Sequence, residues 1–192
     1  MSTSRDPIAC SRGGELIALF HDPSAGFGDC QVVSAHDVPP GMRQLLDHSS
    51  HMTAAMERLH GEPVSLRVIA REDREDRRYA REILLCLGDG RVVQHGIVRI
   101  DLSLLPPKTA SAIRAESAPL GRILLAAGLL CDVHAEQLLR IIVGPGLAGL
   151  FKAAVGTETY GRVATIGLDN RPVIELLEIS APVSGSDRAA SG

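Results

Sequence analysis

Apolar segments joined by very short turns constrain the fold of this chain more than any other feature. One turn contains Asp89–Gly90 and another contains Asp169–Asn170–Arg171, and both combinations favour a tight hairpin. The segments that flank these two turns are residues 79–86 and 91–102, and residues 159–168 and 172–179. Because a turn this short joins only antiparallel neighbours, the sequence predicts a sheet that is largely antiparallel.

Two further strands and several helices complete the predicted architecture. Residues 64–70 have the composition of a strand, and residues 133–143 fit either a helix or a strand, of which we prefer the strand. A glycine-rich loop is expected at residues 144–149. Helices are expected at residues 52–59, which Gly61 follows, at residues 108–117, and from Pro119 onward. The sum is an α+β fold, a six-stranded antiparallel sheet with helices packed on it.

Length and composition allow one folded domain. The chain has 192 residues, of which 45% are hydrophobic, so it can bury a sizeable core and is not disordered as a whole. Residues 1–14 are polar and contain glycine, and residues 183–192 are of low complexity, so we expect both ends to be disordered. A single domain is therefore predicted over residues 15–182.

Charge and composition argue against several classes of partner. The net charge of −3 creates no basic field for nucleic acid, and an aromatic content of 3% leaves little for base stacking. No secretory signal and no long apolar segment is apparent, so we expect a cytoplasmic protein without a membrane span, either a monomer or a small homo-oligomer. The four cysteines form no C-x-x-C pair, and the histidine spacing matches no ligand motif, so no metal is expected.

Arg81 is the first candidate for a binding residue. In a strand over residues 79–86, side chains alternate between faces, so Tyr79, Arg81, Ile83 and Leu85 share one face. An unpaired guanidinium among apolar side chains would cost several kcal/mol of lost hydration. Arg81 therefore needs an anion, which is either a carboxylate of the protein or that of a bound ligand.

Two glutamates of the last predicted strand point to opposite faces of the sheet. Glu178 shares a face with Ile174 and Leu176, whereas Glu175 lies on the other face. One of these carboxyl groups should face the core, where it could hold a proton or bind a hydroxyl group. The alternation alone does not decide which one does so.

Several short motifs together resemble the chorismate pyruvate-lyase (4-hydroxybenzoate synthase) family. They occur in the family's order at residues 51–69 (HMTAAMERLHGEPVSLRVI), 79–86 (YAREILLC), 118–125 (APLGRILL), 161–172 (GRVATIGLDNRP) and 175–182 (ELLEISAP). The resemblance extends from Gln44 to Pro182. It implies a six-stranded antiparallel sheet that closes over a buried ligand under helical flaps, a fold also found in ligand-sensing domains of some transcription regulators.

The resemblance also implies roles for individual residues. Arg81 and the main-chain N–H groups of Met52 and Leu120 would hold the carboxylate of the product, and Glu178 would meet its phenol end as the second catalytic residue. Glu175 is the alternative acid, because the last segment carries one extra residue. The implied reaction eliminates pyruvate from chorismate to give 4-hydroxybenzoate without a cofactor, for ubiquinone biosynthesis or specialised metabolism.

One departure from the family pattern leaves other functions open. The family has a second arginine where this chain has Ile97, and Arg99, two residues further, could substitute for it in substrate binding. One alternative is a related lyase that acts on another enolpyruvyl substrate or gives a different isomer. The other is a non-catalytic domain of the same fold that binds a small aromatic acid. In each case the partner is a small aromatic or cyclohexadiene carboxylic acid.

Overall fold

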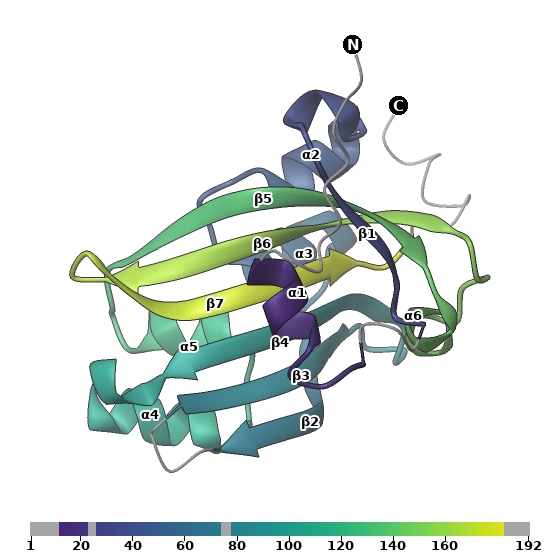
Figure 1. Cartoon of the computed structure of the whole chain (residues 1–192). Coiled ribbons are helices and arrows are strands. Elements are labelled where there is room, and N and C mark those ends of the chain that lie inside the picture. The colour runs from purple at the N-terminus through teal and green to yellow at the C-terminus, as the bar shows by residue number, and fades with distance from the viewer. Residues whose placement is uncertain (1–11, 23–25, 74–77, 183–192) are drawn as a thin grey trace.

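A seven-stranded antiparallel sheet forms the centre of the protein in the computed structural model (Figure 1). The structure describes residues 12–22, 26–73 and 78–182. The strands are β1 (Gly28–Val33), β2 (Ser65–Asp73), β3 (Arg78–Cys86), β4 (Val92–Asp101), β5 (Cys131–Val143), β6 (Glu158–Leu168) and β7 (Arg171–Ser180). Their order across the sheet is β1-β5-β6-β7-β4-β3-β2.

The two predicted hairpins lie side by side and form the middle of this sheet. Strands β3 and β4 are joined through Gly90, whose φ of 83° suits glycine. Strands β6 and β7 are joined through Asp169 and Asn170, with φ values of 51° and 60°. Both residues are therefore in the left-handed conformation that favours two-residue hairpins. Strand β4 pairs with β7, so the two hairpins make one continuous surface.

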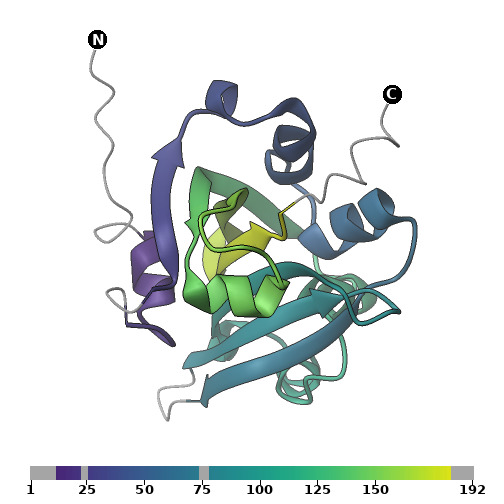
Figure 2. The ribbon, with the colours of Figure 1, turned by 90° about the vertical axis from the view of Figure 1, so that its right-hand side faces the viewer.

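Helices cover both faces of the sheet. They are α1 (Arg12–Ile17), α2 (Pro40–Leu46), α3 (Met52–His60), α4 (Pro107–Arg114), α5 (Leu120–Ala126) and α6 (Pro145–Phe151), with short 3-10 turns at Ala35–Asp37 and Leu102–Leu104. Figure 1 shows α1 lying across β7 and β4, and Figure 2 shows α6 inside the curve of the sheet. None of the helices in the described ranges is long and apolar enough to cross a membrane.

Alternation along the central strands separates two hydrophobic layers. Val98 and Leu176 belong to a buried cluster that also contains side chains of α4 and α5. Ile97 and Leu177, the residues beside Val98 and Leu176 in the chain, belong to a different cluster with side chains of α1 and α6. The central strands are thus buried on both faces, and each face meets its own set of helices.

The structure confirms the predicted fold class and most predicted elements; the helix α2 was not predicted, and there are three further differences. The sheet has seven strands and not six, because β1 adds an edge strand beside β5. The expected loop at 144–149 is part of the helix α6, and α1 begins at Arg12, inside the segment expected to be disordered. Residues 74–77 of the charged segment, and residues 1–11 and 183–192 at the ends, lie outside the described residues.

Candidate functional site

A pocket lies between the sheet and the first turns of α3 and α5. Its floor comes from β2, β3, β4, β5, β6 and β7. The opposite wall, which we call the roof, consists of His51, Met52, Thr53, Pro119, Leu120 and Gly121. The first turns of the two helices thus face the centre of the sheet, and two loops far apart in the sequence form one wall of the pocket.

The middle of the pocket floor consists of apolar side chains and a glycine. Val98 lies directly opposite Arg81 on one side and Leu176 on the other, so these three side chains share the pocket face. Gly96, two residues before Val98, also lines the pocket and lacks a side chain. A Cβ at Gly96 would lie 3.3 Å from the side chain of Ile83, so Ile83 of β3 covers this part of the floor.

Arg81 contributes a buried positive charge that no carboxylate of the described residues neutralises directly. The residue is 1% exposed. Its guanidinium donates one long hydrogen bond of 3.4 Å, from Nη1 to the carbonyl oxygen of Ile113, and its Nε has no partner. The nearby Glu116 carboxylate accepts a hydrogen bond of 2.5 Å from the Tyr79 hydroxyl. Burial lowers the pKa of Arg81, while the neighbouring Tyr79 hydroxyl and Glu116 carboxylate act in the opposite direction.

Arg162 also lines the pocket, but its charge is compensated. The residue is fully buried, and its Nε donates to Oε2 of Glu178 at 2.7 Å. The guanidinium also donates to the carbonyl oxygens of Leu46, His48 and Ser50, at 3.1, 2.9 and 3.3 Å. Arg162 therefore neutralises Glu178 and holds the segment between α2 and α3 against the sheet.

The two arginines lie on opposite sides of the pocket. Arg81 is on β3 and Arg162 is on β6, with β4 and β7 between them, so their backbones are three strand spacings apart, about 14 Å. Gln94 of β4 adds a buried side-chain amide oxygen without a partner. The pocket thus offers a free cation on one side and hydrogen-bond acceptors, Gln94 and Glu178, on the other.

The enclosed space is small in this conformation. The cavity volume is about 50 Å³, which holds a few water molecules but is less than the roughly 150 Å³ of a cavity that admits benzene. A ligand with a ring therefore requires the roof to move away from the sheet. The roof is built from loop and helix-end residues, which are the parts of a fold that move most readily.

Four of the predicted site residues meet in this pocket. Arg81, Glu178, Met52 and Leu120 all line it. The open choice between the two glutamates is thereby decided in favour of Glu178 as the residue on the pocket face. His51, beside Met52, also lines the pocket, and burial lowers its pKa, so it adds no full positive charge there near neutral pH.

Arg99 and Glu175, expected to bind substrate, do not line this pocket. They face each other across β4 and β7, and Nε of Arg99 donates to Oε2 of Glu175 at 2.5 Å. The register explains this position. Val98 is the residue opposite Arg81, so the even-numbered positions of β4 face the pocket, and both Ile97 and Arg99 face away from it.

Sequence reasoning did not place Arg162 and Gln94 in the site. The signal for Arg162 was present, because it alternates with apolar residues in the same way as Arg81. Its pairing with Glu178 depends on the register of β6 against β7, which places the two residues directly opposite each other. Gln94 gave no signal, because a single amide in an apolar strand does not reveal which face it occupies.

The contact between the two roof helices is testable at Gly121. A Cβ at this position would lie 2.8 Å from the Cβ of His51, which precedes α3. Gly121→Ala should therefore push the helices apart and lower the free energy of unfolding by about 1–3 kcal/mol. Gly149→Ala in α6 is the matched control, because nothing lies within 4 Å of its added methyl group. Equal stability of the two variants in urea unfolding would contradict this packing.

Comparison with solved structures identifies the fold. The effector domain of PhnF from Mycobacterium smegmatis aligns with a TM-score of 0.53 and 13% identity, over 69% of this chain and 88% of that domain. A GntR-family transcriptional regulator from Enterococcus faecalis V583 aligns with a TM-score of 0.46 and 15% identity, over 64% of this chain and 95% of that structure.

A third match is longer than the aligned region. YydK from Bacillus subtilis subsp. subtilis str. 168, described as a possible transcriptional regulator, aligns with a TM-score of 0.46 and 13% identity over 61% of this chain. The alignment spans 57% of YydK. No protein-family model matches the sequence. No curated protein matches it either.

These comparisons correct the expected activity. The effector domain of PhnF, the structure named above that aligns with a TM-score above 0.5, is not described as a lyase. The prediction of an enzyme that eliminates pyruvate from chorismate, and with it the assignment to ubiquinone biosynthesis, is therefore wrong. The pocket agrees with this correction, because Glu178, the expected catalytic acid, is bound to Arg162. The chain has the fold of that effector domain, a fold that the resemblance also implied.

Proposed function

We propose that this chain is a non-catalytic ligand-binding domain for a small aromatic carboxylic acid. The uncompensated guanidinium of Arg81 in an otherwise apolar pocket is the observation that supports this most directly. A planar guanidinium binds a carboxylate through two parallel hydrogen bonds, and this contact is strongest where water is excluded. In this proposal the ligand supplies the direct ion pair that no described carboxylate makes with Arg81.

The remaining contacts suit an aromatic ring with a hydroxyl group at its far end. Val98 and Leu176 form an apolar floor beside Arg81. On the other side, the amide oxygen of Gln94 lacks a donor and the Glu178 carboxylate is a second acceptor. In this proposal the backbone N–H groups of Met52 and Leu120 in the roof assist Arg81 in holding the carboxylate.

Occupancy of the pocket is then the signal that the domain provides, in the manner of an effector domain. Ligand binding requires the roof to open and close, because the empty cavity is smaller than a ring. A closed roof over a bound acid places new contacts between α3, α5 and the sheet. We infer that the ligand shifts the roof between two arrangements. We also propose that the protein acts in the cytoplasm.

The test is a titration of the full chain with 4-hydroxybenzoate, benzoate and the neutral analogue 4-hydroxybenzamide. Both acids should raise Tm with increasing concentration, because a ligand that binds only the folded state stabilises it. The amide should have a much smaller effect, since it lacks the charge that Arg81 requires. Equal shifts for acid and amide, no shift with either acid, or release of pyruvate from chorismate would each contradict the proposal.

A further inference from the structure

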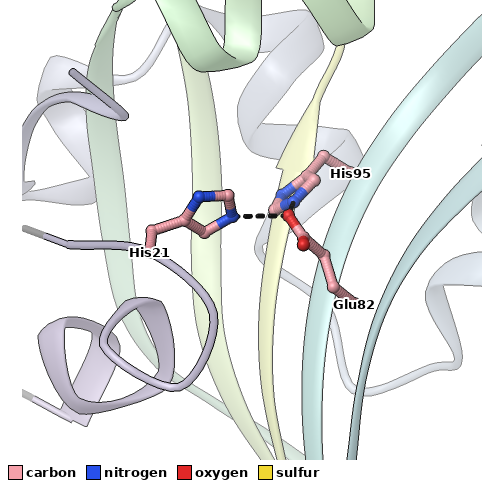
Figure 3. A group of neighbouring side chains, drawn as sticks. All are labelled: His21, Glu82 and His95. Atoms are coloured by element: carbon pink, nitrogen blue, oxygen red, sulfur yellow. Dashed lines mark hydrogen bonds and ion pairs between the residues drawn. The ribbon is translucent and has the colours of Figure 1, made fainter. Parts of the chain in front are cut away.

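Three side chains that could bind a metal meet on the sheet face opposite the pocket (Figure 3). Glu82 of β3 follows Arg81 directly and therefore points to the other side of the sheet. His95 of β4 shares that face and is the diagonal neighbour of Glu82, because Glu82 pairs with Ile97 two residues further along β4. His21 reaches the same place from the segment that follows α1.

One carboxylate oxygen is shared by both imidazoles. Oε1 of Glu82 lies 2.6 Å from Nε2 of His21 and 2.6 Å from Nε2 of His95. The three potential ligand atoms all lie within 4.8 Å of one another. The side chain of His95 is fully buried, that of Glu82 is 5% exposed and that of His21 is 27% exposed. The cluster is thus closed on the sheet side and open to solvent beside His21.

The cluster holds a buried carboxylate without a strong counter-charge. Among the described residues, the ion-pair partners of Glu82 are His21 and His95, and neither arginine nor lysine lies within 4.0 Å of it. A divalent cation placed among the three groups would give this buried carboxylate a full counter-charge in addition to its hydrogen bonds with the two imidazoles.

The surroundings leave His95 able to bind a metal through Nε2. Its Nδ1 is buried and has no partner among the described residues, so the hydrogen bond from Nε2 to Glu82 is what keeps the proton on Nε2. Phe27 contacts both rings, with centroids 4.9 Å from His21 and 5.5 Å from His95, and restricts their orientation. The proton that Nε2 carries in the hydrogen-bonded form can therefore reside on Nδ1 when Nε2 binds a cation.

We propose that His21, Glu82 and His95 bind a single divalent transition-metal ion of the Zn²⁺ class. Two imidazole nitrogens and one carboxylate oxygen are a ligand set that Zn²⁺ uses, with the fourth position taken by water. In a tetrahedral site the ligand atoms are about 3.3 Å apart, so the two 2.6 Å contacts must widen by less than 1 Å, while the two imidazole nitrogens already lie within 4.8 Å of each other. The solvent-exposed side of His21 provides the entry path and the open position.

The ion would connect the segment after α1 to the central hairpin. His21 follows α1, whereas Glu82 and His95 belong to β3 and β4. Metal binding therefore stabilises the contact between the N-terminal helix and the sheet, and this role is separate from the pocket on the other face. The sequence did not indicate the site, because its members are 61 and 13 residues apart and form no local motif.

The test measures ZnCl₂ binding by the full chain after treatment with a chelator. We expect one Zn²⁺ per chain by calorimetry, a Tm that rises with Zn²⁺, and a Co²⁺ absorption spectrum typical of tetrahedral nitrogen and oxygen ligation. His21→Ala should weaken Zn²⁺ binding on the order of 100-fold or more. His134→Ala, which removes an exposed histidine of β5, is the matched control and should bind as the wild type does.

A second variant keeps the test valid if His21→Ala is poorly folded. Glu82→Gln retains an oxygen that can accept a hydrogen bond from an imidazole but removes the charge, so it should lose Zn²⁺ binding while remaining folded. Absence of a Zn²⁺ effect on the wild type, or equal affinity in His21→Ala and His134→Ala, would overturn the metal site. His21→Ala should still respond to 4-hydroxybenzoate, so failure of this proposal is distinguishable from failure of the ligand pocket.

Discussion

Replacement of Arg81 by methionine is expected to weaken aromatic-acid binding by about 100-fold or more without lowering the free energy of unfolding. The loss of affinity follows from removal of a desolvated charge pair, which is worth about 2–5 kcal/mol. Stability should stay equal or rise, because the variant replaces a buried cation that has no ion pair with an apolar side chain of similar length. Calorimetric titration with 4-hydroxybenzoate and urea unfolding measure the two effects.

Arg81→Lys is the matched control for this prediction. Lysine retains the charge but lacks the planar fork, so the affinity for the acid should be intermediate between those of the wild type and Arg81→Met. A loss of several kcal/mol of stability in Arg81→Met would show that the protein itself satisfies this guanidinium. That result would remove the main argument for an anionic ligand.

Replacement of Arg162 by methionine is expected to have the opposite effect on stability. The variant leaves Glu178 buried without its partner, and removal of one member of a buried ion pair costs about 3–5 kcal/mol. It also removes the donor to three carbonyl groups of the segment before α3. Urea unfolding should therefore show a large decrease in the midpoint.

The double variant Arg162→Met with Glu178→Leu separates the two causes of this loss. Removing both charges should recover part of the stability, since no unpaired carboxylate remains, while the three carbonyl groups stay without their donor. A double variant that is no more stable than Arg162→Met alone would mean that the ion pair contributes little. Similar stability changes in Arg81→Met and Arg162→Met would contradict the distinction between a free and a paired arginine.

Much of the fold was predictable because the central strands are long and end in recognisable turns. Strand β1 was not predicted, since its six residues include Asp29 and Gln31 and show little hydrophobic alternation. It is an edge strand, so its conformation depends on the hydrogen bonds that β5 offers. The helix α6 was missed for a related reason. Its glycines favour a loop, and the burial of Leu147 against the sheet overrides that preference.

The candidate site was predictable only as far as alternation within one strand allows. The apolar neighbours of Arg81 in its own strand indicated its burial, and this was confirmed. Arg99 was misplaced, because the pocket face of β4 depends on its register against β3 and not on its own sequence. The group of His21, Glu82 and His95 depends on three separate segments, so no single stretch of sequence could reveal it.

Arg81 and Glu82 are consecutive residues of β3, yet one faces the ligand pocket and the other faces the two histidines. The sheet therefore separates a pocket that would bind an anion from a side-chain cluster that would bind a cation. Inserting or deleting one residue in this strand would exchange the two side chains, placing an acid where a carboxylate should bind and a guanidinium among the imidazoles. One change in the length of β3 would therefore disrupt both proposed sites, whereas replacing Arg81 or Glu82 would affect only one of them.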